Sequence, residues 1–574
     1  MGGELGKPSR PMIVVGTLIL LGAWGCSSKA PSPTAPVRPG PGKVVEAKPP
    51  ANVLELAFPY GSEKKEWLDA VTEEFHRSDV KSTAGKQVRV KLIPMGSGEL
   101  IADILEGRVK ADLASPASSA FIELANADSQ ARTGKPLLGK TKNLLLSPVV
   151  IAMWKPMAEA LGWGQQPIGW AEVLEMAKSE QGWAKYNYPQ WGRFKFGHTH
   201  PEYSNSGLIS LFAEVYAGSG KLKGLTLEDL HKPEVGQFLA QIERSVVHYG
   251  SSTGFFGKKM FAGGPGYLSA AVLYENMVIE SYGAKEPLPF PVVAVYPKEG
   301  TFWSDHPAAV VEREWVDAER RDAAETYIQF LTATPQQQRA MQFGFRPADV
   351  AISLAAPIDA AHGVDPKQPK TTLEVPSAAV AKATIDLWKK HKKHSRVVLL
   401  LDVSGSMKGE KIAEAKQGAE QFIRTLGDED LLSFMPFNHQ AAWAGQDWPM
   451  GAQRQRAIQA VGACFADGGT ALYDAIAQAH RHVEQSAQPD RIVAMVVLSD
   501  GADTNSRMGL PQLLGQIAAQ GEGANRAFRI FTIGYGSEAK KDVLTEIADK
   551  TNARFFAGNP DTIREVFKEI ATFF

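Results

Sequence analysis

Cysteine is scarce in this chain, which holds only Cys26 and Cys464 among its 574 residues. Two thiols cannot form a disulfide framework or a four-cysteine zinc site. Long apolar runs are scarce too, because beyond the N-terminal region none approaches the roughly 20 residues that a membrane-spanning helix needs. We therefore exclude a channel pore built from this chain alone.

An excess of one charge is also missing, since 62 Lys and Arg residues stand against 63 Asp and Glu residues. The net charge of −1 leaves no basic field to attract a nucleic acid, so that class of partner is excluded. Hydrophobic residues make up 44% of the chain, as in folded globular proteins. The length predicts about three or four domain equivalents, or two larger units with tails.

The one long apolar run, residues 12–23, follows two basic residues and ends shortly before Cys26. This order predicts an export signal over residues 1–25. It resembles a bacterial lipoprotein signal, although Ala23 and Trp24 depart from the usual pattern. The resemblance implies that Cys26 is lipidated and that the protein is exported and held to a membrane of the bacterial cell envelope. An uncleaved signal anchor with an incidental cysteine is the alternative.

Residues 26–51 are rich in Pro, Ala, Lys and Gly, which predicts an extended tether without a core. Residues 52–393 then repeat a strand, loop and helix unit. Strands that alternate with helices favour parallel sheets, and about 300 residues is large for one sheet, so we expect an α/β fold with two lobes and a cleft. Strands are expected at Val53–Pro59, Val88–Pro94, Val149–Trp154 and Pro291–Pro297, and helices from Ser62, from Pro116, from Ser204 and over Ala318–Leu331.

Three stretches of this region, Met95–Ala125, Ser204–Gly207 and Tyr296–Val311, resemble extracellular solute-binding proteins of the type II periplasmic class. The nearest kin would be the molybdate, sulfate and iron receptors. The resemblance implies a two-lobed receptor that closes like a clamshell around a small ligand. A retained fold that has lost ligand binding is the alternative.

Several serines of this region precede predicted helices, whose N-termini carry unpaired N–H groups and a partial positive charge. If these ends converge on the cleft, they bind an anion without a basic side chain. Ser62 and Ser97 also fall where the resembled family has ligand serines. The alternative is that these residues only cap their helices. The candidate ligand residues are Ser62, Ser97, Ser204, Asn205, Ser206 and, more weakly, Tyr274 and Tyr296.

Two histidines, His198 and His200, suggest a metal pair, because residues two apart on a strand share a face. No third ligand is apparent near them in the sequence, so a metal site there is not predicted.

Residues 394–574 begin with an apolar strand at Val397 that runs into Asp402, and an amphipathic helix follows. Four more strands alternate with helices, which predicts a doubly wound, Rossmann-like α/β domain with its site at the carboxyl ends of the strands. These strands are expected at Leu431–Phe437, Arg491–Asp500, Arg529–Gly536 and Ala553–Gly558.

Oxygen-bearing side chains follow these strands: DVSGS from Asp402, GGT before a helix, and SDG after the central strand. Hydroxyls and carboxylates are hard ligands that suit Mg²⁺, Mn²⁺ or Ca²⁺. The region resembles the von Willebrand factor type A (VWA) domain. The resemblance implies a metal-ion-dependent adhesion site in which the cation accepts an Asp or Glu from a partner protein; a purely structural role for the loop is the alternative. The residues of that site are Asp402, Ser404, Ser406, Thr470 and Asp500.

No nucleophile and base arrangement and no phosphate-binding loop stands out, so we expect a binding protein and not an enzyme. The main hypothesis is adhesion: the VWA metal binds a partner protein while the solute-receptor domain binds or senses a small ligand, with an anion as the candidate. The alternative is a substrate-binding component of an ABC-type transporter, with the VWA domain as a docking module.

Overall fold

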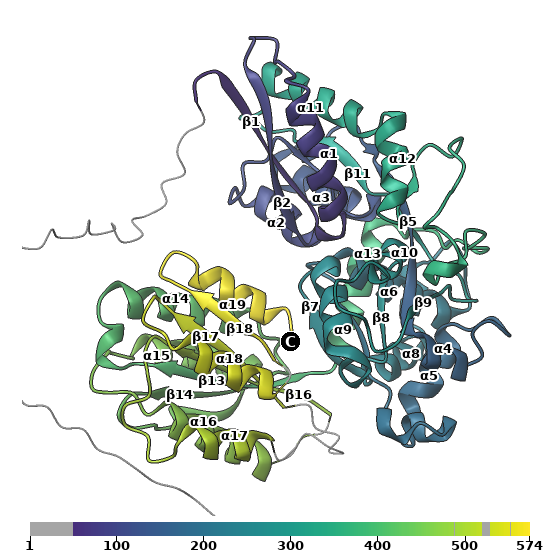
Figure 1. The fold of residues 1–574 in the computed structure, drawn as a ribbon. Coiled ribbons are helices and arrows are strands. Elements are labelled where there is room, and N and C mark those ends of the chain that lie inside the picture. The colour runs from purple at the N-terminus through teal and green to yellow at the C-terminus, as the bar shows by residue number, and fades with distance from the viewer. Residues whose placement is uncertain (1–49, 487, 489, 519–527, 552) are drawn as a thin grey trace, which may run out of the picture. The chain divides into compact units, whose positions relative to one another are not determined.

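The structure of the protein is a computed structural model that describes residues 50–486, 488, 490–518, 528–551 and 553–574 (Figure 1). The predicted signal over residues 1–25, Cys26 and nearly all of the predicted tether lie outside the described residues. Among the helices of the described part, none is both long and apolar enough to cross a membrane.

The first lobe begins with two parallel strands, β1 (Val53–Gly61) and β2 (Gln87–Met95), which α1 (Lys65–Arg77) connects. Later segments complete this lobe, because β11 returns to lie between β3 and β4. The helix predicted from Pro116 starts later, because Ser118 is still extended. The remaining elements are α2 (Ser97–Leu105), β3 (Leu113–Ala114), α3 (Ser119–Thr133), β4 (Lys142–Asn143), β11 (Pro307–Val310), α11 (Ala318–Leu331) and α12 (Thr334–Gln342).

The second lobe is built on a long buried strand, β5 (Leu145–Trp154), within a sheet of order β10-β5-β8-β6-β7. The prediction of parallel sheets is wrong around β5, which runs antiparallel to β8, β9, β10 and β12. An apolar strand buried on both faces carries no mark of its direction, so the path of the chain decides it. The other strands are β6 (Phe196–Thr199), β7 (Val246–Gly250), β8 (Ala270–Tyr274), β9 (Val292–Val295), β10 (Trp303–Ser304) and β12 (Arg346–Pro347).

Helices connect the strands of this sheet, and three of them carry residues of the site. In Figure 1, α6 (Asn205–Ser219), α8 (Pro233–Glu243), α9 (Thr253–Tyr267) and β7 lie in one region of the second lobe. The others are α4 (Lys155–Ala160), α5 (Trp170–Lys178), α7 (Leu227–Leu230), α10 (Glu275–Ser281) and α13 (Ala378–His391).

The C-terminal domain is a six-stranded sheet of order β15-β14-β13-β16-β17-β18, parallel except for the edge strand β15. Figure 1 shows α14 and α19 on one side of it and α16 and α17 on the other. Its strands are β13 (Ser395–Asp402), β14 (Leu431–Phe437), β15 (Gly445–Pro449), β16 (Ile492–Ser499), β17 (Arg529–Tyr535) and β18 (Phe555–Gly558). Its helices are α14 (Glu410–Thr425), α15 (Met450–Gly462), α16 (Leu472–Gln485), α17 (Leu510–Ala518), α18 (Lys541–Lys550) and α19 (Ile563–Ala571).

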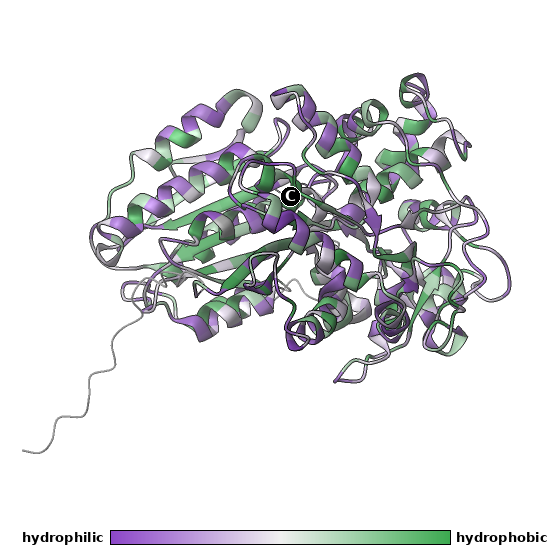
Figure 2. Ribbon diagram, turned by 90° about the horizontal axis from the view of Figure 1, so that it is seen from above, coloured by the Kyte–Doolittle hydropathy of each residue, from purple (hydrophilic) through white to green (hydrophobic). Residues whose placement is uncertain are grey.

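Every residue of β13 is buried, because helices cover both faces of the sheet. Val397 and Leu399 join one apolar cluster with α14 and α19, whereas Val398 and Leu400 join a second with α16 and α18. The strands accordingly appear green between two-coloured helices (Figure 2). With both faces filled, the accessible edge of this sheet is where the strands end.

Candidate functional site

The predicted metal loops of the VWA domain lie at one edge of its sheet. Strand β13 ends at Asp402, and its parallel neighbour β16 ends just before Asp500. Their carboxyl ends meet because Leu401 pairs with Leu498 in the register. The third loop reaches the same place, since the Gly405 N–H donates to the Gly468 carbonyl over 2.8 Å.

Four of the five predicted metal residues form a continuous chain of hydrogen bonds. The Ser406 hydroxyl donates to Asp500 Oδ1 over 2.7 Å and lies 3.0 Å from the Ser404 hydroxyl. The Ser404 N–H in turn donates to Asp402 Oδ1 over 2.9 Å. Both aspartates are fully buried, whereas Ser406 is exposed, so the cluster opens to solvent at one point.

The fifth residue, Thr470, is buried and held by its backbone. Its N–H donates to Thr504 Oγ1 over 2.9 Å, and its carbonyl accepts from the Thr504 N–H over 2.8 Å. Thr504 belongs to the loop after β16, so the loops brace one another. Carboxylates and hydroxyls arranged in this way fit a hard divalent cation such as Mg²⁺.

Two residues of this site were missed by sequence reasoning. The Ser499 hydroxyl donates to Asp402 Oδ2 over 2.6 Å, and the Lys411 ammonium donates to Asp500 Oδ2 over 2.6 Å. Lys411 lies in the first turn of α14, where a lysine is typical of an exposed helix surface and gives no signal. Burial raises the pKa of Asp402, and the charge of Asp500 adds to that effect.

The predicted ligand residues of the solute-receptor region meet between the two lobes. The Ser62 hydroxyl donates to Ser252 Oγ over 2.9 Å, and the Ser204 hydroxyl lies 3.1 Å from Thr253 Oγ1. Thr253 Oγ1 also donates to Ser206 Oγ over 3.0 Å. These contacts join the start of the first lobe to α6 and α9 of the second.

Asn205 is the most connected of the predicted ligand residues. Its amide donates to the Tyr274 hydroxyl over 3.0 Å, and its Oδ1 accepts from the Ser118 hydroxyl over 2.6 Å. Ser118 belongs to the first lobe and Tyr274 ends β8 in the second. Asn205 therefore links the lobes directly.

The capping alternative is not realised at these serines. None of these serines makes a side-chain cap bond at the start of the short 3₁₀ helix Ser62–Lys64, of α2 or of α6; at α2 it is Glu99 that accepts from the Gly96 N–H. The Ser97 hydroxyl instead accepts from the Ala117 N–H over 2.9 Å. The helix N–H groups themselves have protein acceptors, since the Gly98 N–H donates to the Tyr203 carbonyl over 2.9 Å. A ligand there would replace these contacts.

Tyr296 does not join the serines. Its hydroxyl donates to Glu275, which also accepts two hydrogen bonds from Arg346, over 2.7 and 2.6 Å. Burial and the Glu275 charge raise the pKa of Tyr296. Tyr296 thus belongs to a buried ion-pair cluster near β5 and β12, and its contacts there are those of a structural residue.

A charged trio that the sequence did not reveal lies beside the serines. Lys64 is fully buried, with its ammonium 2.8 Å from Glu63 Oε1 and 3.3 Å from His306 Nδ1. Burial and the Lys64 charge lower the pKa of His306 to about 4. Although burial opposes it, the charge of Lys64 lowers the pKa of Glu63 to about 2. In the sequence Glu63 and Lys64 stand at the start of a predicted helix, where charged residues are usually exposed, and only the fold buries them against His306.

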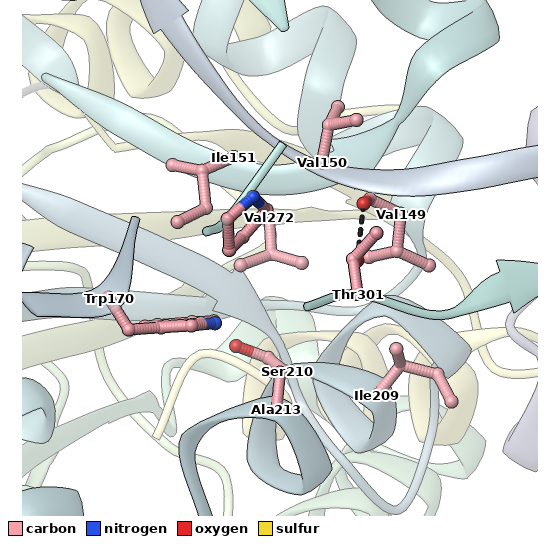
Figure 3. Close-up of a pocket in the computed structure, with 10 residues that line it drawn as sticks. Val149, Val150, Ile151, Trp170, Ile209, Ser210, Ala213, Val272 and Thr301 are labelled. Atoms are coloured by element: carbon pink, nitrogen blue, oxygen red, sulfur yellow. Dashed lines mark hydrogen bonds between the residues drawn. The ribbon is translucent and has the colours of Figure 1, made fainter. Parts of the chain in front are cut away.

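A small cavity lies elsewhere in the second lobe, between β5, β8 and α6 (Figure 3). Val149, Val272 and Trp170 are among the apolar residues that line it, and the Thr301 hydroxyl donates to the Val149 carbonyl over 2.6 Å. Its volume of about 10 Å³ is at most that of one water molecule, so it is a packing defect and not a solute site.

The chain matches two family models. Residues 58–346, just over half of the chain, match the bacterial extracellular solute-binding proteins, and residues 397–569 match the von Willebrand factor type A domain. Domains of these two kinds are typically non-catalytic binding modules, and the first kind is exported.

Individual relatives are distant. An uncharacterised protein of Synechocystis is 27% identical over 175 residues, which are 30% of this chain and 40% of that protein. A solved von Willebrand factor type A protein from Catenulispora acidiphila is 25% identical, covers 32% of this chain and 42% of its own, and has a TM-score of 0.27. The sulfate-binding protein of Mycobacterium tuberculosis is 20% identical, covers 52% and 88%, and has a TM-score of 0.36.

The chain spans 40% of the length of the Synechocystis relative, so that relative is no guide to the function of the whole chain. The match to the solute-binding family is independent of that relative and covers residues of both lobes. The chain therefore belongs to the bacterial extracellular solute-binding proteins and carries a von Willebrand factor type A domain after its solute-binding domain.

Proposed function

We propose that the VWA domain binds one hard divalent cation, Mg²⁺ or in its place Mn²⁺ or Ca²⁺, and offers it to an acidic side chain of a partner protein. The observation that carries this proposal is the hydrogen-bonded chain from Asp402 through Ser404 and Ser406 to Asp500. The five ligands would be Asp402, Ser404, Ser406, Thr470 and Asp500.

The charges support an open metal site. Asp402 and Asp500 together carry −2, which a divalent cation balances once it displaces the Lys411 ammonium from Asp500. Since hydroxyls fill much of the remaining coordination, the cation keeps its attraction for an outside carboxylate. The exposed position of Ser406 leaves an approach for that carboxylate.

Isothermal titration with Mg²⁺ and Mn²⁺ tests the cation. We expect one site per chain that Asp402→Ala abolishes, because half of the site's negative charge is removed. The matched control is Glu546→Ala, an exposed carboxylate on α18 of the same domain. Equal cation binding by wild type and Asp402→Ala would contradict the proposal.

A pull-down with the full chain as bait tests the partner. A specific protein should be retained in Mg²⁺, released by EDTA and lost with Asp402→Ala. If the partner protein is retained in EDTA, its binding does not need the cation. The adhesion mechanism would then be wrong even if the VWA domain binds the cation.

For the solute-binding domain we propose a small anion as ligand, held by the residues around Asn205 and by the buried Lys64. The cross-lobe bonds of Asn205 to Ser118 and Tyr274 support this placement. A thermal-shift series with sulfate, phosphate and molybdate tests it, since a ligand at 100 times its dissociation constant adds about 2.7 kcal/mol. Asn205→Ala should lose the shift, whereas Ser219→Ala at the other end of α6 should keep it. No shift with any oxyanion would contradict an oxyanion ligand.

A transport role is the second candidate, and the family match over both lobes favours it. In that role the solute-binding domain delivers its ligand to a membrane permease, and the VWA domain serves as the dock. Ligand-dependent compaction in small-angle scattering, together with binding to a permease encoded beside this chain, would support transport over adhesion.

We further propose that the protein is a lipoprotein of the bacterial cell envelope, anchored through Cys26. Mass spectrometry of the mature N-terminus should find an acylated cysteine, and Cys26→Ser should release the protein from the membrane fraction. An intact, uncleaved N-terminus would favour the signal-anchor alternative.

A further inference from the structure

A second cluster of metal-ligand side chains is buried in the second lobe, away from the serines. His198 lies on β6, Glu214 on α6, and Glu243 is the last residue of α8. All three are fully buried, and one ligand atom of each lies within 4.8 Å of the others. Within the described ranges this is the one group of three His, Cys, Asp or Glu side chains so arranged.

One polar atom of each of the three side chains already has a hydrogen-bond partner outside the cluster. The Tyr249 hydroxyl donates to Glu243 Oε2 over 2.6 Å, and the Ser210 hydroxyl donates to Glu214 Oε1 over 2.7 Å. His198 Nδ1 lies 2.8 Å from the Thr199 carbonyl, which can only accept, so Nδ1 carries the proton. Such partners orient metal ligands in known metal sites.

The polar atoms of these side chains that remain are His198 Nε2, Glu243 Oε1 and Glu214 Oε2. Nε2 and Oε1 lie 3.0 Å apart, and both are acceptors once Nδ1 holds the imidazole proton. Glu214 Oε2 is buried and has no hydrogen-bond partner. Three acceptors that converge without a donor need either protons or a cation.

Protons satisfy the cluster only in part. A proton on Nε2 completes the bond to Glu243, in line with the raised pKa of His198, where the charge of Glu243 outweighs burial. Burial and the Glu243 charge raise the pKa of Glu214 to about 8, but a proton on Oε2 has no acceptor to reach. A divalent cation instead uses all three atoms and balances the −2 charge of the two carboxylates.

We propose that His198, Glu214 and Glu243 bind a buried divalent transition-metal ion of the Zn²⁺ type. Imidazole nitrogen with carboxylate oxygens suits Zn²⁺ better than Mg²⁺ or Ca²⁺. Ligands at the usual zinc distances and tetrahedral angles lie about 3.3 Å apart, close to the 3.0 Å between Nε2 and Oε1. Of the two histidines noted in the sequence, only His198 belongs to this site, and its further ligands come from α6 and α8. His200 takes no part.

The ion would brace the segment that carries the solute residues. Thr199 follows His198, and its hydroxyl lies 2.8 Å from Ser206 Oγ and accepts from the Gly207 N–H over 2.8 Å. Joining β6, α6 and α8 behind this contact holds the N-terminus of α6 in place. The site is structural and distinct from the VWA metal loops.

Metal analysis of the full chain tests the proposal. The Asp402→Ala variant, whose VWA site is disabled, is unfolded, refolded with Zn²⁺ and dialysed against EDTA at pH 7.5. We expect one zinc ion per chain, lost when Glu214→Gln or His198→Gln is added and kept with Glu234→Gln, an exposed position on α8. Co²⁺ in place of Zn²⁺ should show a visible absorption band that is lost when Glu214→Gln is added.

The result for the Asp402→Ala chain with the cluster intact decides even where a further variant fails to fold. If that refolded chain holds no zinc, or binds Co²⁺ without a change in absorption, the proposal is overturned and the cluster is a protonated network. Zinc retained by a folded chain with Glu214→Gln and His198→Gln added overturns it too. A gain in the unfolding temperature of the Asp402→Ala chain with Zn²⁺, absent once Glu214→Gln is added, supports it.

Discussion

At the scale of single residues, Lys411 controls the charge of the VWA metal loops. Its ammonium lies 2.6 Å from Asp500 Oδ2 and balances part of the negative charge that the proposed cation would balance. A metal ion that binds Asp500 therefore competes with this ion pair. We expect Lys411→Met to tighten Mn²⁺ binding by about tenfold, the equivalent of about 1.4 kcal/mol, in isothermal titration.

Lys408→Met is the control for that variant, because Lys408 lies just before α14 but is exposed and 3.7 Å from Asp467. Its affinity for Mn²⁺ should stay at the wild-type value. Weaker binding by Lys411→Met would mean that the lysine helps to hold the site together.

Cys464 is half-buried, and burial raises the pKa of its thiol to about 11. Two units above the ordinary value leave roughly 100-fold less thiolate at pH 8, and thiolate is the reactive form. We expect native protein to react slowly with iodoacetamide at pH 8 and urea-unfolded protein to react quickly, as measured by mass spectrometry. Equal rates in both states would contradict a buried thiol.

At the scale of elements, the N-terminus of α2 fits against the other lobe only because residue 98 is glycine. A Cβ on Gly98 would overlap the Glu202 carbonyl oxygen and touch the Phe121 ring. We expect Gly98→Ala to shift the lobes apart, with a larger radius of gyration in scattering and a loss of about 1–3 kcal/mol of unfolding free energy.

Gly515 offers the matched control, because a Cβ there meets no atom within 4 Å and the residue lies inside α17. Gly515→Ala should leave the radius unchanged and stabilise the helix by up to about 1 kcal/mol. A Gly98→Ala chain as compact and stable as wild type would mean that the lobes do not close in this way.

At the scale of the whole molecule, the buried trio of Glu63, Lys64 and His306 makes stability depend on pH. The pKa of His306 is lowered to about 4, so the unfolded chain binds this proton at a higher pH than the folded chain. The stability is complete above the unfolded pKa near 6.5 and is lost as the pH falls towards 4. Glu63, with its pKa lowered to about 2, adds a loss between about pH 4.5 and 2.

We expect the unfolding free energy to fall by about 2 kcal/mol between pH 7.5 and 5 through His306 alone. Urea unfolding at the two pH values measures it, and His306→Gln should show a smaller drop. An equal drop in the variant would assign the acid sensitivity to other groups.

The local elements and the oxygen motif could be predicted from the amino-acid sequence. Helix α11 (Ala318–Leu331) and strand β14 (Leu431–Phe437) have the predicted bounds, because apolar periodicity and breaker residues act within a few neighbours. The DVSGS and SDG motifs were likewise readable, since each follows its own strand directly.

Four features could not be predicted in this way: the direction of β5, the antiparallel edge strand β15, the burial of Lys64, and the meeting of His198 with Glu214 and Glu243. Each depends on how distant segments pack, and no local pattern encodes that path. Tyr296 shows the same limit, because its partner Glu275 begins α10 and is held in turn by Arg346 from β12. Periodicity records which face a residue buries, whereas the fold alone determines what lies against that face.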